Sequence, residues 1–532
     1  MDEKLPESVD VVVLGTGLPE AILASACARA GLSVLHLDRN EYYGSDWSSF
    51  TMTMIHEVEE NKVFLGHHKT SRPSFQVPKL SEEEISKLSA HLLESEKLVE
   101  LGNREVIENI QRTWIPRDSD DVPIKQKLEE MGQMRRFSID LVPKILVSKG
   151  NMVQTLCDSQ VSHYAEFKLV NRQLCPTQDK NTENSAKIML NPVPCSKGEI
   201  FQSSVLSILE KRALMKFITF CTQWSTKPTE EGRQLLGDYS DRPFSEFLAQ
   251  MGVAETLQSF IINTIGILQP NPTAMSGMLA SCEFMDSVGH FGPSPFLFPL
   301  YGCGELSQCF CRLAAVFGSL YCLGRPVQAL VRENDRITAI IANNERINCR
   351  HVVMSPRFVP KDVPIQNVQK IERVVFATDK SIKEVEKEHL TLLNLASLRP
   401  KSTISRLIEV GFEACTAPKG HFLVHATGTQ SDDDEKSVES LAEQIFEESQ
   451  VSPYWKMSFT ANSMKFDAEG AGLGSNVVVA PPVDANIHYS SVIKECRKLF
   501  CSTWPDLDFL PRAIKNEEDE EEKEASESSE TV

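Results

Sequence analysis

The spacing of hydrophobic residues near the amino terminus predicts a strand, a helix and a second strand in close succession. Val11 to Leu14 form an unbroken apolar run, which indicates a buried strand. Residues 18–30 follow with a helical pattern that ends at Gly31, and glycine is favoured just beyond a helix. Residues 33–37 form the second apolar run. This order is typical of a domain built on a parallel sheet, so we expect an α/β fold.

Residues 55–134 have a mixed and largely polar pattern with only weak helical pieces. Prolines interrupt the stretch at positions 73, 78, 116 and 123, and proline breaks helices and central strands. We therefore expect a polar insertion outside the core, partly disordered. Ordered structure is expected to resume at residues 139–144 and 161–168.

Two later stretches carry the three-to-four spacing of an amphipathic helix. The second covers residues 244–267. The first covers residues 201–221, where the apolar positions include Val205, Leu206, Ile208, Leu209, Leu214, Phe217 and Ile218. We therefore predict that residues 196–290 form an all-helical second domain, whose apolar faces pack against each other or against an apolar ligand.

Strand patterns return after this helical region. Residues 296–304 predict a strand and a turn, residues 305–317 a helix that stops at Gly318, and residues 489–500 a last helix. Short apolar runs lie between them at 327–331, 337–342, 352–354, 373–378, 403–410, 421–425 and 477–480. The first domain would then comprise three segments, 1–54, 135–195 and 291–515. This layout is typical of Rossmann-like, FAD-binding-type folds such as the flavin monooxygenases.

Composition narrows the class of protein. The chain has 532 residues, 41% of them hydrophobic, and no apolar run reaches the roughly 18 residues that a membrane-spanning helix needs. The amino terminus is acidic and leads straight into a strand, so we expect no signal peptide. A net charge of −19 argues against binding nucleic acid, which requires basic surface. Residues 516–532 hold nine carboxylates against one lysine and are predicted to be a disordered, solubilising tail.

The turn after the first strand is similar to a dinucleotide-binding fingerprint in which one residue is out of place. Gly15 permits the tight turn, Gly17 lets a pyrophosphate approach the backbone, and Asp38 stands where a ribose-binding carboxylate is expected. Glu20 occupies the third glycine position. A carboxylate in the first helical turn is favourable at an empty helix N-terminus and unfavourable beside a phosphate. Its bulk is also expected to obstruct the packing of the helix on the strand.

Other catalytic motifs are absent from the sequence. We find no His-Glu-x-x-His, no Gly-x-Ser-x-Gly and no Walker lysine loop, and residues 302–305 are glycine-rich but carry no lysine. The fourteen cysteines lack the spacing of a zinc site and indicate reduced thiols in a cytosolic protein. We expect no catalytic residue and no metal site. An enzyme hypothesis rests on the Rossmann-like start alone.

Three longer motifs point to one protein family. They are residues 14–20 (LGTGLPE), 38–44 (DRNEYYG) and 298–306 (FPLYGCGEL). Together with residues 164–168 (YAEFK) and 210–212 (EKR), they strongly resemble the superfamily of Rab GDP-dissociation inhibitors and Rab escort proteins. The resemblance spans most of the chain, apart from residues of about 55–134 and the acidic tail. It implies a flavoprotein-type fold that has lost its flavin, so no cofactor is expected.

Within the superfamily, three features favour the escort branch, component A of Rab geranylgeranyltransferase. The inhibitors are shorter and lack residues 55–134, and residues 47–50 (WSSF) resemble the escort version. Phe201 stands where escort proteins carry phenylalanine and the inhibitors leucine. Two alternatives stay open: an inhibitor that extracts and recycles prenylated Rabs, and a flavin-dependent oxidoreductase.

The resemblance implies a non-catalytic chaperone. Such a protein binds a newly made, GDP-bound Rab GTPase and presents its C-terminal cysteines to the α/β heterodimer of the transferase. It then holds the geranylgeranyl chains of the product and delivers it from the cytosol to a membrane, which it contacts only transiently.

The resemblance also assigns roles to particular residues. It implies a Rab-binding surface that contains Tyr43, Glu305 and Arg312, with Arg39 in the same motif as Tyr43. It implies a transferase contact at Phe201, to which Leu209 is a further candidate. The pattern alone favours purely structural roles, in which Glu305 caps its helix, Arg312 is a surface charge and Phe201 is a core aromatic.

Overall fold

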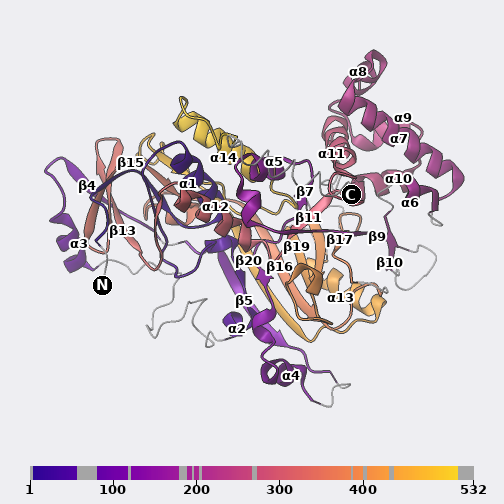
Figure 1. The fold of residues 1–532 in the computed structure, drawn as a ribbon, viewed down its shortest axis with the longest axis horizontal. Coiled ribbons are helices and arrows are strands. Elements are labelled where there is room, and N and C mark those ends of the chain that lie inside the picture. The colour runs from indigo at the N-terminus through magenta and orange to yellow at the C-terminus, as the bar shows by residue number, and fades with distance from the viewer. Residues whose placement is uncertain are drawn as a thin grey trace, which may run out of the picture.

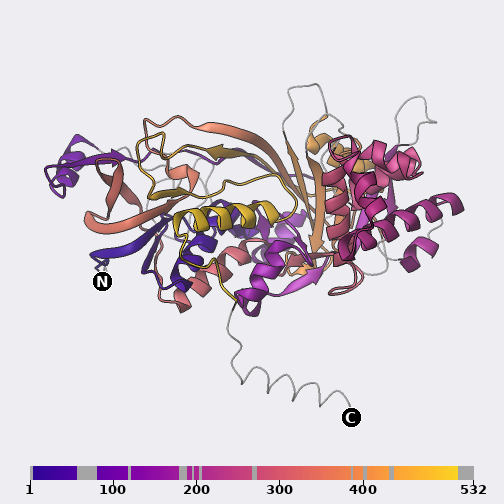
Figure 2. The ribbon, with the colours of Figure 1, turned by 90° about the horizontal axis from the view of Figure 1, so that it is seen from above.

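The computed structural model consists of a mixed α/β body with a helical lobe at one end (Figures 1 and 2). Two large sheets form the body, and helices cover them. The residues that the structure describes are 4–56, 81–102, 104–117, 122–178, 188–193, 197–202, 206–265, 272–384, 388–398, 404–429 and 436–512. The predicted acidic tail at 516–532 lies outside them.

The first large sheet contains the predicted strand–helix–strand unit. β1 (Ser8–Leu14) lies between β2 (Val34–Leu37) and β15 (Glu345–Met354), and these three strands are parallel. The sheet has the order β12-β2-β1-β15-β14-β13-β4, and a further strand, β21, pairs with β15. The remaining bounds are β12 Leu320–Cys322, β14 Arg336–Ala342, β13 Val327–Glu333, β4 Glu96–Glu100 and β21 Val477–Val479.

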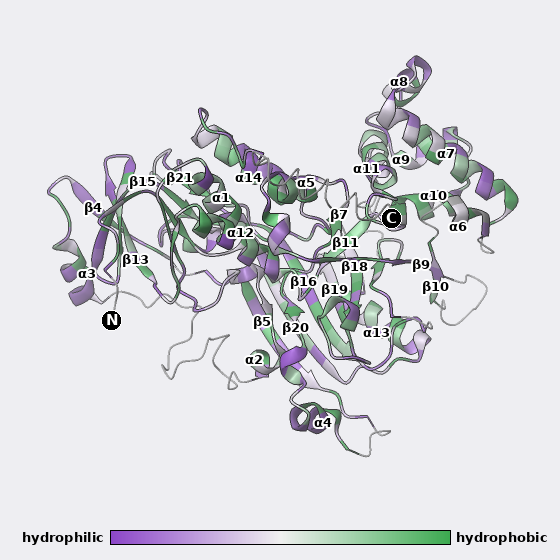
Figure 3. Ribbon diagram, viewed as in Figure 1, coloured by the Kyte–Doolittle hydropathy of each residue, from purple (hydrophilic) through white to green (hydrophobic). Residues whose placement is uncertain are grey.

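Three helices pack together beside this sheet. α1 (Leu18–Arg29) connects β1 to β2, and it contacts both α12 (Gly304–Val316) and α14 (Ser490–Thr503). α1 is buried from its first residue to Ala28, because the sheet covers one side and the two helices cover the other. In Figure 3, α1 and α12 are largely hydrophobic, as a central position requires.

The second large sheet is mostly antiparallel and has the order β10-β9-β17-β18-β19-β16-β20-β5. α13 (Val438–Ser449) packs on it through a buried apolar face. The strand bounds are β5 Ile107–Trp114, β9 Arg172–Gln178, β10 Ile188–Pro192, β16 Gln366–Thr378, β17 Thr391–Asn394, β18 Ser405–Gly411, β19 Phe422–Thr429 and β20 Trp455–Lys465.

Residues 55–134 differ from the expected insertion outside the core. β4 pairs with β13 at the edge of the first sheet, and β5 pairs with β20 at the edge of the second. An edge strand with one solvated face alternates polar and apolar residues, which explains why the sequence pattern looks polar. The helices of the stretch are α2 Met52–His56, which begins just before it, α3 Glu82–Ser89 and α4 Ile124–Glu130. The division of the chain into domains remains a prediction.

The helical lobe comprises the region that the sequence predicts to be all-helical (Figure 2). Its elements are α6 Lys197–Gln202, α7 Ile208–Thr226, α8 Glu230–Gly237, α9 Phe244–Gln250, α10 Glu255–Phe260, the π-helix Ile261–Ile265 and α11 Ala274–Ser287. The single helix expected over 201–221 is divided, because Ser207 caps a new helix with a reciprocal bond to Glu210. The helix expected over 244–267 is divided at Gly252, which adopts a positive φ of 80°.

The described residues also form two small sheets. β3 (Ser49–Phe50) pairs with β6 (Ile139–Asp140), and β11 (Phe296–Pro299) lies between β7 (Leu146–Val147) and β8 (Phe167–Leu169). α5 (Asn151–Asp158) follows β7. Among the residues described, none of the helices has the length and apolar character needed to cross a lipid bilayer.

Candidate functional site

The carboxylate of Asp38 is wholly occupied inside the protein. One oxygen, Oδ2, accepts hydrogen bonds from the Thr16 backbone N–H at 2.8 Å, the Thr16 hydroxyl at 2.6 Å and the Ser45 hydroxyl at 2.7 Å. The other oxygen accepts from the Asn40 N–H at 2.9 Å. Asp38 is also buried, so its carboxylate is not accessible to a ribose in this conformation. The residue instead ties the turn after β1 to the loop that follows β2.

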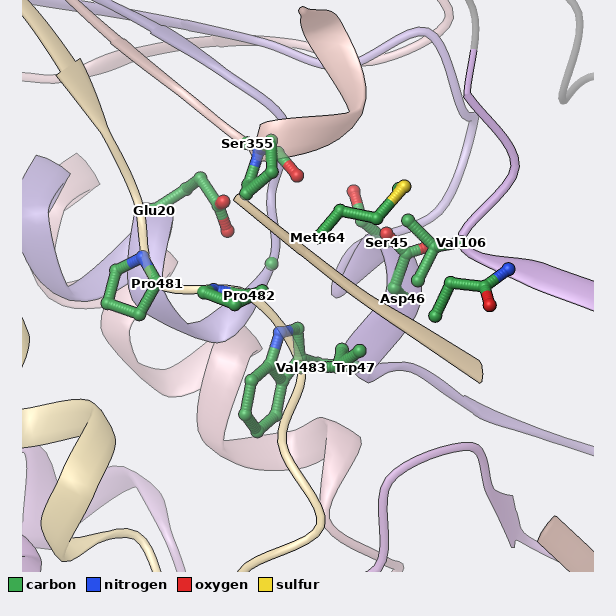
Figure 4. A pocket seen from close by; sticks show the side chains of 13 residues that line it. Glu20, Ser45, Asp46, Trp47, Val106, Ser355, Met464, Pro481, Pro482 and Val483 are labelled. Carbon is green, nitrogen blue, oxygen red and sulfur yellow. The ribbon is translucent and has the colours of Figure 1, made fainter. Parts of the chain in front are cut away.

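Glu20 fills the space in front of the first turn of α1. Its side chain is only 3% exposed, and it lines a small cavity with Gly17, Trp47 and Pro482 (Figure 4). Burial raises the pKa of this carboxyl to about 8, and the nearby carboxylates of Asp46 and Asp38 add to the effect. The group is therefore largely neutral at pH 7. The expected obstruction of the helix packing does not occur, because the side chain points into the cavity and α1 still packs on the sheet.

The cavity beside Glu20 does not fit a dinucleotide. Its volume is about 20 Å³, which is room for roughly one water molecule. Pockets for cofactor-sized ligands have volumes of about 300 Å³ or more. A carboxyl group over the helix N-terminus, with Asp38 already bonded, leaves neither a phosphate site nor a ribose site in this conformation.

Tyr43 lies close to α12, to which it is linked through Tyr321. Tyr43 is 36% exposed, and its ring meets Tyr321 of β12 edge-on at a centroid distance of 6.0 Å. Tyr321 in turn interacts with Cys311 of α12. The structure thus brings the loop after β2 against the helix that carries Glu305 and Arg312.

Glu305 and Arg312 occupy one side of α12, and both influence the Cys309 thiol between them. The Arg312 side chain is exposed, and its guanidinium carbon lies 4.5 Å from the centre of the Tyr164 ring. Glu305 is half-buried and accepts a hydrogen bond from Gln308 Nε2 at 3.2 Å. Burial raises the pKa of Glu305, and the carboxylate of Asp140 raises it further. An aromatic ring, a carboxylate and a guanidinium form a surface suited to a protein partner.

Arg39 does not join this surface. Its guanidinium is directed inward, 5.9 Å from the centre of the Phe358 ring. Burial and the nearby Arg357 lower the pKa of Arg39 to about 9. The pattern of the motif places Arg39 only four residues before Tyr43, but the turn between them sends the two side chains in different directions.

The two candidate transferase contacts lie on different helices. Phe201 is in α6, and its side chain lies outside the described part of the chain. Leu209 is in the first turn of α7 and is 75% exposed, and its neighbour Ile208 is 72% exposed. Both apolar side chains at the start of α7 are therefore accessible to a partner.

A large apolar cavity was not foreseen from the sequence. Its volume is about 650 Å³, and it lies between α5, β8, β11 and the segment before β11. Its apolar lining consists of Val153, Leu156, Phe167, Leu169, Phe291, Pro293 and Leu297. These residues are scattered over 145 positions of the chain, from Val153 to Leu297, so no local pattern could reveal them.

The comparisons with known proteins identify the family. The family model described as GDP dissociation inhibitor matches residues 1–72 and 119–512. The chain belongs to this family. It is 76% identical over 519 residues to the Caenorhabditis elegans protein named Rab proteins geranylgeranyltransferase component A 1, and the match covers 97% of each chain. Residues 73–118, which contribute α3, β4 and β5, are outside the match to the family model.

Solved structures confirm the predicted fold class. The structure of a Rab GDI from Plasmodium falciparum has a TM-score of 0.69 at 19% identity and covers 96% of this chain and 100% of its own. An oxidoreductase from Methanosarcina mazei has a TM-score of 0.50 at 12% identity, covering 92% of this chain and 99% of its own. The Rossmann-like, FAD-binding-type architecture predicted from the sequence is therefore confirmed.

Proposed function

We propose that this protein is a Rab escort protein, the component A of a Rab geranylgeranyltransferase. It binds a newly made Rab GTPase in the GDP form, presents the Rab C-terminal cysteines to the transferase, and carries the prenylated product to a membrane. The observation that carries this proposal is the 76% identity, over 97% of both chains, to a protein named for that role. The protein acts in the cytosol and contributes no catalytic group of its own.

The surface formed by Tyr43, Glu305 and Arg312 is the proposed Rab-binding site. Tyr43 offers a partly exposed ring, and aromatic residues and arginine are the commonest anchors of protein interfaces. The Arg312 guanidinium already contacts the Tyr164 ring, which reduces the side-chain entropy lost when a partner binds it. Arg39 is not part of this proposed site, because its charge is directed into the protein.

The transferase contact is proposed to involve Phe201 and the start of α7. Leu209 and Ile208 expose apolar side chains there, and the capping box of Ser207 and Glu210 fixes the helix end that presents them. This patch is on the helical lobe, whereas α12 is on the body (Figure 1). The Rab and the transferase are therefore proposed to bind separate surfaces. A protein that presents the Rab to the transferase must bind both of them at once.

The cavity beside α5 is the proposed receptor for the apolar end of the Rab. Burying a geranylgeranyl group away from water stabilises the complex by about 0.8 kcal/mol of free energy for each buried CH₂. The described helical lobe is filled by its own side chains, among them Phe217, Phe244 and Phe247, which are fully buried. The 650 Å³ cavity is apolar and open to the surface. Transfer from it to a bilayer exchanges one apolar environment for another.

A reconstituted prenylation reaction tests the proposal. Transferase heterodimer, geranylgeranyl diphosphate and Rab·GDP are mixed with and without this protein, and lipid transfer is followed by mass spectrometry of the Rab. We expect transfer only when the protein is present. A GDP-dissociation inhibitor would extract prenylated Rab from membranes without supporting transfer. A flavin oxidoreductase would be yellow when purified, and a substrate would reduce its flavin. Extraction without lipid transfer, or a bound flavin that a substrate reduces, would overturn the proposal.

A further inference from the structure

Asp140 is a buried carboxylate that is hydrogen-bonded to both of the segments that carry the proposed Rab-binding surface. It is fully buried in β6, where it pairs with Ser49 of β3. Its Oδ1 atom accepts a hydrogen bond from the Ser49 hydroxyl and another, at 2.8 Å, from the Cys303 N–H. Ser49 follows the Tyr43 loop, and Cys303 is the residue just before α12. One carboxylate oxygen therefore joins two segments that are more than 250 residues apart in the chain.

Further hydrogen bonds link Ser49 to the start of α12 and Ser48 to Tyr43. The Ser49 oxygen accepts the Gly304 N–H at 2.8 Å, so the first N–H groups of α12 are bonded to this pair. On the other side, the Ser48 hydroxyl donates to the Tyr43 carbonyl at 2.8 Å, and the Leu141 N–H donates to the Ser48 carbonyl at 3.1 Å. A short chain of hydrogen bonds thus runs from Tyr43 to the start of the helix that carries Glu305.

Two glycines at the start of α12, Gly302 just before it and Gly304 as its first residue, show how close this approach is. Gly302 has a φ of 106°, and a Cβ atom added there would lie 2.6 Å from Asp140 Oδ1. A Cβ atom at Gly304 would lie 2.6 Å from the Ser49 backbone nitrogen. Neither position can accept a side chain without moving the helix away. The glycine-rich turn that lacks the lysine of a phosphate loop is therefore shaped for the contact with Ser49 and Asp140.

We infer that Asp140 and Ser49 are positioning residues that hold the Tyr43 loop and α12 together as one Rab-binding surface. Asp140 cannot touch a partner, since it has no exposed surface, and it acts through the two segments it joins. Without it, the segments that carry Tyr43 and the pair of Glu305 and Arg312 would lose a shared buried acceptor and be held together less firmly. The inference rests on the proposed function, because it assumes that these three residues meet a Rab.

Titration of the full-length protein with fluorescently labelled Rab·GDP tests the inference. Asp140→Ala removes the shared acceptor and should weaken Rab affinity by about tenfold or more. Asp140→Asn keeps an acceptor oxygen for both donors and should retain most of the affinity. Ser49→Ala removes the links to Asp140 and Gly304 and should weaken affinity similarly; it replaces Asp140→Ala if that variant does not fold. Full affinity in folded Asp140→Ala, or in folded Ser49→Ala when it serves as the replacement, would overturn the inference.

A matched control separates positioning from general loss of stability. Asn476 is also buried and bonds the Ile337 and Arg350 carbonyls at 2.7 and 2.8 Å, away from the proposed surface. Asn476→Ala should lower the melting temperature while leaving Rab affinity unchanged. In addition, Tyr43→Ala should cost less affinity in the Asp140→Ala background than in the wild type, because positioning is already lost. Equal costs in the two backgrounds would contradict the inference.

The same titrations separate this inference from the proposed function. If Tyr43→Ala and Arg312→Ala bind Rab·GDP as tightly as the wild type, the proposed surface itself is wrong. If those two variants lose affinity while Asp140→Ala and Ser49→Ala do not, the surface stands and the positioning role fails.

Discussion

Asp38 holds Thr16 by two hydrogen bonds, one from the backbone N–H at 2.8 Å and one from the hydroxyl at 2.6 Å. The Thr16 hydroxyl oxygen and carbonyl both accept from the Gly44 N–H at 3.1 Å. Gly44 follows Tyr43 directly. The carboxylate that would bind a ribose in a dinucleotide enzyme therefore supports the loop that carries the proposed Rab contact. A position that contacts the cofactor in dinucleotide enzymes serves here as an internal support for the proposed Rab-binding surface.

Asp38→Ala should destabilise the protein and loosen the Tyr43 loop. Three buried donors on Thr16 and Ser45 lose their common acceptor, and each hydrogen bond to a charged group contributes about 1.5–3 kcal/mol. We expect the free energy of unfolding to fall by at least about 3 kcal/mol in urea titrations. Rab affinity should fall as well. Unchanged stability in Asp38→Ala would show that these bonds are replaced by water at no cost.

Glu20 should make stability depend on pH in the neutral range. Its pKa is near 4.5 when exposed and about 8 in the folded protein, so the folded state keeps a proton that the unfolded state releases. Its contribution is most favourable below pH 4.5 and is lost progressively as the pH rises through 8. The loss is on the order of a few kcal/mol. Urea titrations from pH 5 to pH 9 should therefore show stability falling more steeply in the wild type than in Glu20→Gln.

Glu20→Gln is the direct comparison because it keeps the shape of the side chain and cannot ionise. The difference in unfolding free energy between variant and wild type should widen from pH 5 to pH 8 and then level off. Other buried carboxyls, such as Glu409, are present in both proteins and cancel in the difference. A difference that stays constant with pH would mean that the pKa of Glu20 is not raised.

The local parts of the fold were predictable because their signals are local. The unit from Val11 to Leu37 was readable from its apolar runs and Gly31, and the helix that begins near Glu305 from its stop at Gly318. The sequence pattern does not reveal the edge strands β4 and β5. A strand with one face exposed to solvent has only about half the apolar residues of a strand that is buried on both faces. β20 was missed although it contributes to a large sheet, since its serine, threonine and asparagine residues mask its pattern.

The candidate site was only partly predictable. Tyr43, Glu305 and Arg312 came from family motifs, and the structure places the loop that carries Tyr43 beside the helix that carries the other two. The orientation of Arg39 depends on Phe358 and Arg357, more than 300 residues away, so no motif could supply it. The sequence does indicate a role for Asp140, because this carboxylate lies between Ile139 and Leu141 in an apolar stretch. Such a residue is buried at a cost and therefore has a partner.

Leu209→Ala should weaken binding of the transferase and leave Rab affinity unchanged. The side chain is 75% exposed at the start of α7, so its removal affects a contact with a partner rather than the core. Phe201→Ala should have the same effect, and the two together should abolish stimulation of prenylation at limiting protein concentration. Leu279, another exposed leucine of the helical lobe on α11, provides the control, and Leu279→Ala should bind the transferase normally. Normal binding by the Phe201 and Leu209 variants would place the transferase elsewhere.

Arg312→Ala should reduce Rab affinity by about tenfold with no change in melting temperature. The guanidinium contacts the face of Tyr164 and is otherwise available to a carboxylate on the Rab. Arg312→Lys keeps the charge but loses the planar group that stacks on the ring, so it should recover only part of the affinity. Arg233→Ala, at an exposed arginine of α8, removes the same charge from the helical lobe and should leave binding unchanged. If Arg312→Ala and Arg233→Ala weaken binding equally, net charge rather than a specific contact governs the interaction, and raising the salt concentration should then reduce both affinities in parallel.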